Sequence, residues 1–226
     1  MKSIFKKIQT PRALAQLPSQ LGQSNNYEDW RNSFLKDRLR FLYLVAVFGN
    51  PSMFLVDYFQ GDQRITLFLL RILMETFWIL GFLIVRFKND ILQPNGLLIF
   101  WVLGANICIS EMTVVLGGFS SLYYIGLNLM FLCAAVIVPV SWKSHAIAQL
   151  SSLIYYLVAN IFRSQGIVNL ADVSLNLMLL IWTCIALTVS VYLYERLHRA
   201  EFEARMKLLE LDRLKSEFFA NVSHEL

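Results

Sequence analysis

The chain has 226 residues, of which 57% are hydrophobic and only 16% are charged. A soluble domain needs about a quarter of its residues charged to cover its surface. The missing charge is replaced by long blocks of Leu, Ile, Val and Phe, which excludes a soluble globular protein and indicates a polytopic membrane protein.

The first forty residues are predicted to form a cytoplasmic N-terminal leader, residues 1–40. They hold eight Lys and Arg against three Asp and Glu, whereas residues 41–194 hold six of each. No apolar run precedes Leu39, and no short apolar run is followed by a small-residue cleavage site. The leader therefore does not have the pattern of a cleavable signal peptide.

Six segments approach the twenty residues that a helix needs to cross a bilayer. They are Phe41–Phe59, Ile65–Phe87, Gly96–Leu116, Leu122–Val140, Ala146–Phe162 and Val173–Tyr194. The first is interrupted by Gly49, Asn50 and Pro51, and the fifth is short and partly polar. Neighbouring helices can satisfy a broken or polar backbone inside a bundle, so we count both as spans. The sequence predicts an all-α fold with a six-helix transmembrane domain over 41–194.

The Lys and Arg residues indicate which side of the membrane each loop occupies. Eight lie in the leader, two near Arg86, one at Lys143 and six after Tyr194, whereas the alternate loops hold only Arg64 and Arg163. By the positive-inside rule both termini are cytoplasmic and the protein is a multi-pass protein of the inner (plasma) membrane. The loops are short, so a signal from outside must reach the membrane bundle itself.

Residues 195–226 are predicted to continue the last span as a cytoplasmic signalling helix. The segment has no Gly or Pro, and its apolar residues recur every three or four positions. They are Leu197, Ala200, Ala204, Leu208, Leu211, Leu214, Phe218 and Val222. Such a narrow stripe is typical of a coiled coil and predicts a homodimer; the alternative is a helix that lies along its own domain or the membrane surface.

The last twelve residues, Lys-Ser-Glu-Phe-Phe-Ala-Asn-Val-Ser-His-Glu-Leu, resemble the phosphoacceptor box of sensor histidine kinases. The resemblance implies that His224 is the phosphoacceptor and that Glu225 handles its proton. It also implies a response regulator or receiver domain as a partner. In that family the box continues with Arg-Thr-Pro or a variant, so we expect the sequence to be cut inside the first helix of the dimerisation and phosphotransfer domain.

The nucleotide-binding part of such a kinase is not expected in this fragment. The sequence contains no Gly-rich nucleotide loop and neither GxGxxG nor GxxxxGK[ST]. ATP with Mg²⁺ is expected to bind in a missing C-terminal domain, and the fragment is not expected to be active alone.

The helical position of His224 is consistent with the role of phosphoacceptor. At 100° per residue, Glu217, Asn221 and His224 fall within an arc of about 60°, which lies more than about 100° from the centre of the apolar stripe. An exposed imidazole with a pKa near neutrality is a competent nucleophile. The alternative is a solvated histidine without a role. His198 and His145 have no second ligand at workable spacing, so no metal site is expected.

Four ionisable residues lie inside the predicted spans: Asp57, Arg71, Glu75 and Glu111. Each costs roughly 2.5–3.5 kcal/mol at mid-bilayer, so such residues usually line a site or pair with one another. Arg71 and Glu75 stand at i and i+4 and are expected to form an ion pair on one helix face.

Together with Trp101 and Asn106, these four residues form the predicted ligand-binding set. On the predicted topology they indicate a polar pocket that opens outward, with further aromatic walls. Those walls would come from Trp78, Tyr123, Tyr124, Tyr155 and Trp182. The alternative interpretation is that these residues are polar contacts between helices and an interfacial aromatic belt.

A second resemblance suggests the kind of signal. An arrangement of six spans with short loops, followed directly by a kinase helix, is similar to that of the receptor kinases for α-hydroxyketone quorum-sensing autoinducers. Phe48-Gly49-Asn50-Pro51-Ser52-Met53-Phe54, followed by Leu69-Leu70-Arg71, resembles their first hairpin. The resemblance implies a small amphiphilic ligand held among the membrane helices.

The sequence therefore favours the membrane sensor of a two-component histidine kinase that controls phosphorylation of His224. Its expected partners are a second copy, a response regulator and a small-molecule signal, with no nucleic acid. A small transporter or channel-like bundle, or a membrane anchor for another output enzyme, is the alternative.

Overall fold

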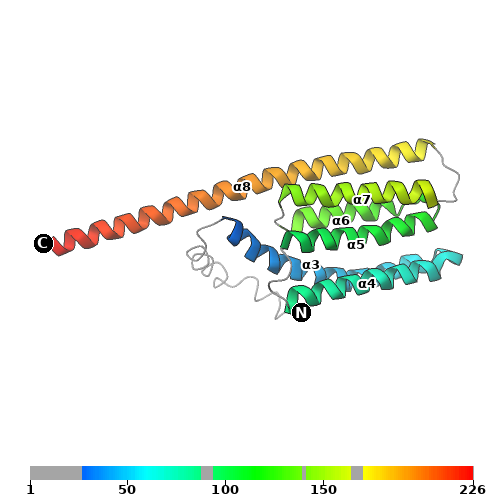
Figure 1. Ribbon diagram of the computed structural model, residues 1–226, viewed down its shortest axis with the longest axis horizontal. Helices are drawn as coiled ribbons and strands as arrows, with labels where there is room; N and C mark the ends of the chain where they lie inside the picture. The colour runs from blue at the N-terminus through cyan, green and yellow to red at the C-terminus, as the bar shows by residue number, and fades with distance from the viewer. Residues whose placement is uncertain (1–26, 88–93, 139–140, 164–169, 226) are drawn as a thin grey trace. The chain divides into compact units, whose positions relative to one another are not determined.

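The computed structural model describes residues 27–87, 94–138, 141–163 and 170–225, and throughout these residues the regular structure is helical (Figure 1). In chain order the elements are α3 (Tyr27–Tyr58), η1 (Gly61–Gln63), α4 (Arg64–Phe87), α5 (Pro94–Val115), η2 (Gly118–Ser120), α6 (Tyr124–Ile137), α7 (Trp142–Arg163) and α8 (Leu170–Glu225). The predicted all-α class is confirmed.

Several of these helices are long and apolar enough to cross a membrane. Among the described residues, five helices are long and apolar enough: they lie on α3, α4, α5, α7 and α8. Helix α6 is also apolar but is shorter, with 14 residues. Each of the six predicted spans overlaps one of these helices, and residues 139–140 of the fourth lie outside the described residues. Many large apolar side chains face outward, among them Leu69, Leu73 and Leu80, which are each at least half exposed. Soluble proteins rarely expose such a continuous apolar surface, so the bundle is compatible with a membrane environment.

The residues separate into two compact units. One contains Phe34–Glu195, and the other combines the described part of 1–33 with 196–225. Helices α3 and α8 each contribute residues to both units. The units are described separately below as the bundle unit and the cytoplasmic unit, the second name following the predicted topology.

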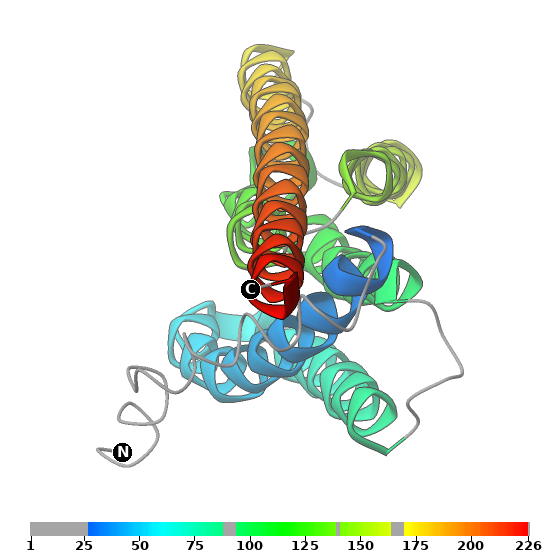
Figure 2. The same cartoon turned by 90° about the vertical axis from the view of Figure 1, so that its left-hand side faces the viewer.

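Helix α5 is the centre of the bundle unit, since it contacts α4, α6 and α7. Figure 2 shows the helices of the bundle nearly end-on. Its buried side chains include Leu98, Val102, Ala105 and Met112. Two glycines let other helices approach closely. A Cβ at Gly81 of α4 would overlap the ring of Tyr43, and one at Gly104 of α5 would overlap the ring of Phe77. These positions need glycine because the facing ring occupies the space of a side chain.

Helix α3 is continuous through Pro51, although the sequence predicts an interruption there. Proline lacks the N–H that would bond to the carbonyl four residues earlier. The acceptor that loses its donor here is the Val47 carbonyl, while the Ser52 hydroxyl donates to the Gly49 carbonyl at 2.6 Å. The helix passes the proline with the loss of this one bond.

In the cytoplasmic unit, the first two turns of α3 pack on α8. Phe202 of α8 is buried between Tyr27 and Trp30, with ring centroids 5.7 Å from each. Farther along α8 the described apolar side chains of the predicted stripe are exposed: Leu208, Leu211, Leu214, Phe218 and Val222. An exposed stripe of this kind is compatible with the predicted dimer, which remains a prediction.

Candidate ligand cavity

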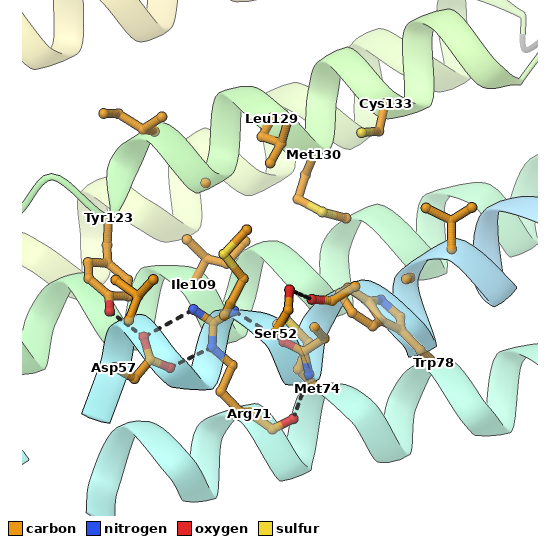
Figure 3. Close-up of a pocket in the computed structure, with 18 of the residues that line it drawn as sticks. Ser52, Asp57, Arg71, Met74, Trp78, Ile109, Tyr123, Leu129, Met130 and Cys133 are labelled. Atoms are coloured by element: carbon orange, nitrogen blue, oxygen red, sulfur yellow. Dashed lines mark hydrogen bonds and ion pairs between the residues drawn. The ribbon is translucent and has the colours of Figure 1, made fainter. Parts of the chain in front are cut away.

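A charged cluster lies where α3 ends, α4 begins and α6 begins (Figure 3). Arg71 donates from Nε to Asp57 Oδ2 at 2.7 Å and from Nη2 to Asp57 Oδ1 at 3.3 Å. The Tyr123 hydroxyl also donates to Asp57 Oδ1. The Asp57 side chain is fully buried and that of Arg71 is 14% exposed. The two charges compensate each other, so this end of the bundle is polar but has no net charge from the pair.

The predicted ion pair between Arg71 and Glu75 is wrong. Arg71 Nη1 instead donates to Asn50 Oδ1 at 3.1 Å, and Asn50 Nδ2 donates to Glu75 Oε2 at 2.9 Å. The planar guanidinium binds a carboxylate best through two parallel bonds, and Asp57 on the facing helix offers that geometry. Asn50 then separates the two residues that share a helix face and bonds to both.

The charged cluster closes one end of a cavity of about 510 Å³ within the bundle unit. Its walls are predominantly apolar and come from α3, α4, α5 and the α6 region. The other lining residues are Leu42, Val45, Ala46, Gly49, Asn50, Ser52, Met53, Val56, Met74, Trp78, Trp101, Ile109, Leu122, Ile125, Gly126, Leu129, Met130 and Cys133. Val56, Leu122 and Ile125 are more than half exposed, so the cavity reaches the apolar surface of the bundle.

Two tryptophans lie deeper along the same cavity. Trp78 and Trp101 stack at 6.2 Å between ring centroids, and they are 4% and 2% exposed. Neither indole Nε1 has a hydrogen-bond partner among the described residues. A buried donor without a partner costs about 1–3 kcal/mol. The cavity thus offers a polar end and apolar walls, with two buried indole N–H groups in the tryptophans that line it.

The other two residues of the predicted binding set lie elsewhere. Glu111 accepts from the Tyr155 hydroxyl at 2.6 Å and from Arg163 Nη1 at 2.5 Å. Asn106 donates from Nδ2 to Ser152 Oγ at 3.0 Å. Both interactions join α5 to α7, so here the interhelical alternative describes the structure better than a pocket does.

The bond from Asn106 to Ser152 belongs to a polar seam on α7, which we define as His145, Gln149, Ser152, Tyr156 and Asn160. All five are buried and are spaced by three or four residues, so they share one helix face. Asn160 Nδ2 donates to Thr113 Oγ1 of α5 at 3.1 Å, and Thr188 of α8 donates to Gln149 Oε1 at 2.7 Å. The seam fixes the register of α5 against α7.

The structure therefore brings Asp57, Arg71 and Trp101 together around one cavity. Glu75 does not line that cavity, but it accepts a hydrogen bond from Asn50, which does. Asn50 was not in the predicted binding set, although an amide before a proline inside an apolar span was an available signal. Tyr123 was predicted only as an aromatic wall, because nothing in the sequence shows that its hydroxyl reaches Asp57.

The predicted catalytic residues are outside the part of the chain whose side chains are described. The backbone of α8 is helical to Glu225, but the side chains of His224 and Glu225 lie outside the described residues. Their roles remain predictions.

Comparisons with known proteins do not assign the chain to a family. Neither a family model, nor a curated protein, nor a solved structure matches it. The fold and cavity define an all-helical protein with several long apolar helices, of a kind compatible with a membrane.

Proposed function

We propose that this chain is the membrane sensor of a dimeric, two-component histidine kinase, with His224 as the phosphoacceptor. The observation that carries the proposal is the continuity of α8. This helix runs unbroken from Leu170 to Glu225, so an apolar helix leads directly into the kinase-like sequence Lys-Ser-Glu-Phe-Phe-Ala-Asn-Val-Ser-His-Glu-Leu. A rigid helix is the simplest way to carry a displacement out of a membrane bundle.

On this proposal all six apolar helices cross the inner membrane and both termini are cytoplasmic. The 14-residue α6 is short for a full span, and the flanking apolar residues would complete it. The charged cluster, at the end of α3 and the start of α4, then lies near the outer surface. The cavity runs inward from there toward Trp78 and Trp101.

The signal proposed for this cavity is a small neutral amphiphile. The Asp57–Arg71 pair compensates its own charge and leaves polar atoms for hydrogen bonding. The apolar walls suit a hydrocarbon chain, and the polar side chains of Asn50, Arg71 and Tyr123 at the cavity end suit a carbonyl or hydroxyl oxygen. A charged head group would gain no net counter-charge from the pair and would lose its hydration.

The proposed reaction is phosphoryl transfer in the full-length protein, where ATP with Mg²⁺ binds in a further domain. An imidazole nitrogen of His224 forms a bond to the γ-phosphorus, and the bond from that phosphorus to the oxygen of ADP breaks. Glu225 accepts a hydrogen bond from the other ring nitrogen and holds its proton. The phosphoryl group then passes to a response regulator or receiver domain.

The test of the acceptor uses the full-length protein in lipid nanodiscs with radiolabelled ATP. His224→Gln should abolish label incorporation, whereas Ser216→Ala, a change on an exposed face of the same helix, should leave it at the wild-type level. Glu225→Gln should slow incorporation by roughly 10²- to 10⁴-fold if it handles the proton. Label that persists in His224→Gln would show that the acceptor is another residue.

The test of the signal class compares decanol with decanoate and decyltrimethylammonium in the same nanodiscs. Only decanol should change the rate of phosphorylation in a saturable manner. Gly49→Phe should remove that response, because Gly49 lines the cavity and a Cβ there meets no atom within 4 Å. A response to all three compounds that persists in Gly49→Phe would indicate a bilayer effect and would refute the cavity as the sensor.

A transporter or channel-like bundle is the alternative function, favoured by the buried charges of Asp57 and Arg71. Liposomes that contain residues 1–194 separate the two. A sensor should give no flux of protons, cations or organic anions above that of empty liposomes, and measurable flux would favour the transporter.

A further inference from the structure

The cytoplasmic unit contains an aromatic contact that we call the clamp, defined as Tyr27 and Trp30 of α3 with His198 and Phe202 of α8. The Tyr27 and Phe202 rings meet edge to face at an interplanar angle of 66°, and Trp30 lies tilted by 35° against Phe202. Trp30 also lies 6.4 Å from the His198 ring. Phe202 is only 6% exposed, although most of the described side chains beyond it on α8 are exposed.

A cation adds to this contact. The Arg199 guanidinium lies 5.2 Å from the centroid of the Tyr27 ring, within the range of a cation–π interaction. The start of α3 therefore contacts one face of α8 through two residues one turn apart, Phe202 and Arg199. This is the turn immediately after the last apolar span, where a sensor must pass its signal to the kinase helix.

The same helix α3 provides the largest share of the cavity wall. Nine lining residues come from it: Leu42, Val45, Ala46, Gly49, Asn50, Ser52, Met53, Val56 and Asp57. Among the described residues that line the cavity, none belongs to α8. A molecule that enters the cavity therefore touches α3 directly and does not touch the helix that it must control.

Helix α3 is also the cavity wall whose backbone bonding is interrupted. Pro51 removes one backbone hydrogen bond in the middle of that wall, and Gly49 leaves open space beside it. Asn50 and Asp57 bond α3 to Arg71 of α4, and Asp57 also accepts from Tyr123. An occupant of the cavity is therefore expected to displace α3 together with the residues bonded to it.

We propose that α3 is the transmission element of this protein: occupancy of the cavity displaces α3, and the clamp passes that displacement to α8. This inference rests on the proposed sensor function. It differs from direct transmission along α8 because it makes the output depend on the contact of Tyr27 and Trp30 with Phe202.

The experiment uses the full-length protein in nanodiscs, with Cys108, Cys133 and Cys184 replaced by Ala. Cysteines are placed at Trp30 and Phe202 and joined by a short bis-methanethiosulfonate, which a reductant cleaves. In the linked state the reagent joins residues 30 and 202 covalently. In the reduced state that link is broken, and the aromatic rings of Trp30 and Phe202 are no longer present. Gly49→Phe serves as a permanent occupant of the cavity, and Gly49→Ala is its matched control, since a lone Cβ there meets nothing within 4 Å.

We expect the rate of autophosphorylation to differ by roughly threefold or more between Gly49→Phe and Gly49→Ala. This difference should be seen both with the native clamp and with the linked clamp. In the reduced state the two Gly49 variants should be equal. An equal effect of Gly49→Phe in the reduced state would overturn the proposal, because the signal would then bypass the clamp. No effect of Gly49→Phe in any state would also overturn it.

A second measurement does not depend on kinase activity. The rate at which the two introduced cysteines are linked should differ between Gly49→Phe and Gly49→Ala, and identical rates would count against transmission through α3. Failure of the proposed function looks different: phosphorylation would be absent or independent of His224, while the linking rates would still respond to the Gly49 variants.

Discussion

The buried pair of Asp57 and Arg71 gives the sharpest prediction about stability. Asp57→Asn removes one charge and leaves the Arg71 guanidinium, 14% exposed, without its counter-charge. It also weakens three hydrogen bonds, two from Arg71 and one from the Tyr123 hydroxyl. We expect the free energy of unfolding to fall by about 3–5 kcal/mol, the usual cost of breaking a buried pair from one side.

The contacts that remain place the loss near the lower end of that range. Arg71 keeps its bond to Asn50 Oδ1 at 3.1 Å, so about 3 kcal/mol is expected for Asp57→Asn. Arg71→Gln should cost a similar amount, because it leaves the fully buried Asp57 carboxylate unpaired. Glu75→Gln is the matched control. Its amide oxygen can still accept from Asn50 Nδ2, so the loss should stay below about 1 kcal/mol.

The assay is equilibrium unfolding in mixed micelles, followed by helical circular dichroism, with the double variant Asp57→Asn/Arg71→Gln completing the cycle. The double variant should be more stable than the sum of the two single losses predicts, by at least about 1 kcal/mol, because neither charge is then left alone. A loss for Asp57→Asn no larger than that for Glu75→Gln would refute this account. The account would also be refuted if the same kind of cycle gave a larger interaction free energy between Arg71 and Glu75 than between Arg71 and Asp57.

Two further predictions concern the packing of α5. Gly104→Leu should lower the unfolding free energy by about 1–3 kcal/mol, because its side chain would overlap the Phe77 ring, whereas Gly49→Ala should leave it within about 0.5 kcal/mol. Equal melting temperatures for these two variants would contradict the close approach of α4 and α5. Asn160→Ala removes the bonds to Thr113 and should cost about 1–2 kcal/mol, and a neutral result in the same unfolding assay would show that the seam does not hold α5 to α7.

The helices of this protein could be predicted from sequence, because an apolar run of about twenty residues leaves few alternatives once a backbone must satisfy its own hydrogen bonds. Each of the six predicted segments overlaps a helix. The disagreement at Pro51 has a local cause: the missing N–H leaves only the Val47 carbonyl without its helical donor, and the rest of the helix continues on both sides of it. The continuity of α8 was predicted from the absence of Gly and Pro after Tyr194.

The candidate site could be predicted only in part. Burial cost identified Asp57, Arg71, Glu75 and Glu111 as unusual residues, and each of them has a polar partner in the structure. Sequence spacing could suggest only the partner within one helix, at i+4, and it therefore selected Glu75 for Arg71. The actual partner lies on another helix, and a single sequence carries no information about which helix faces which.

The position of small residues explains why a cavity forms where it does. Ala46 and Gly49 on α3 share the cavity with Gly126 on α6, so neither wall has a large side chain at these points. Bundle interiors are normally packed to crystal density, and an apolar void costs free energy in proportion to its size. Because the cavity also reaches the exposed side chains of Val56, Leu122 and Ile125, an apolar chain could enter from the surface of the bundle and fill the space that these small residues leave. Binding would then favour whichever position of α3 best encloses that chain.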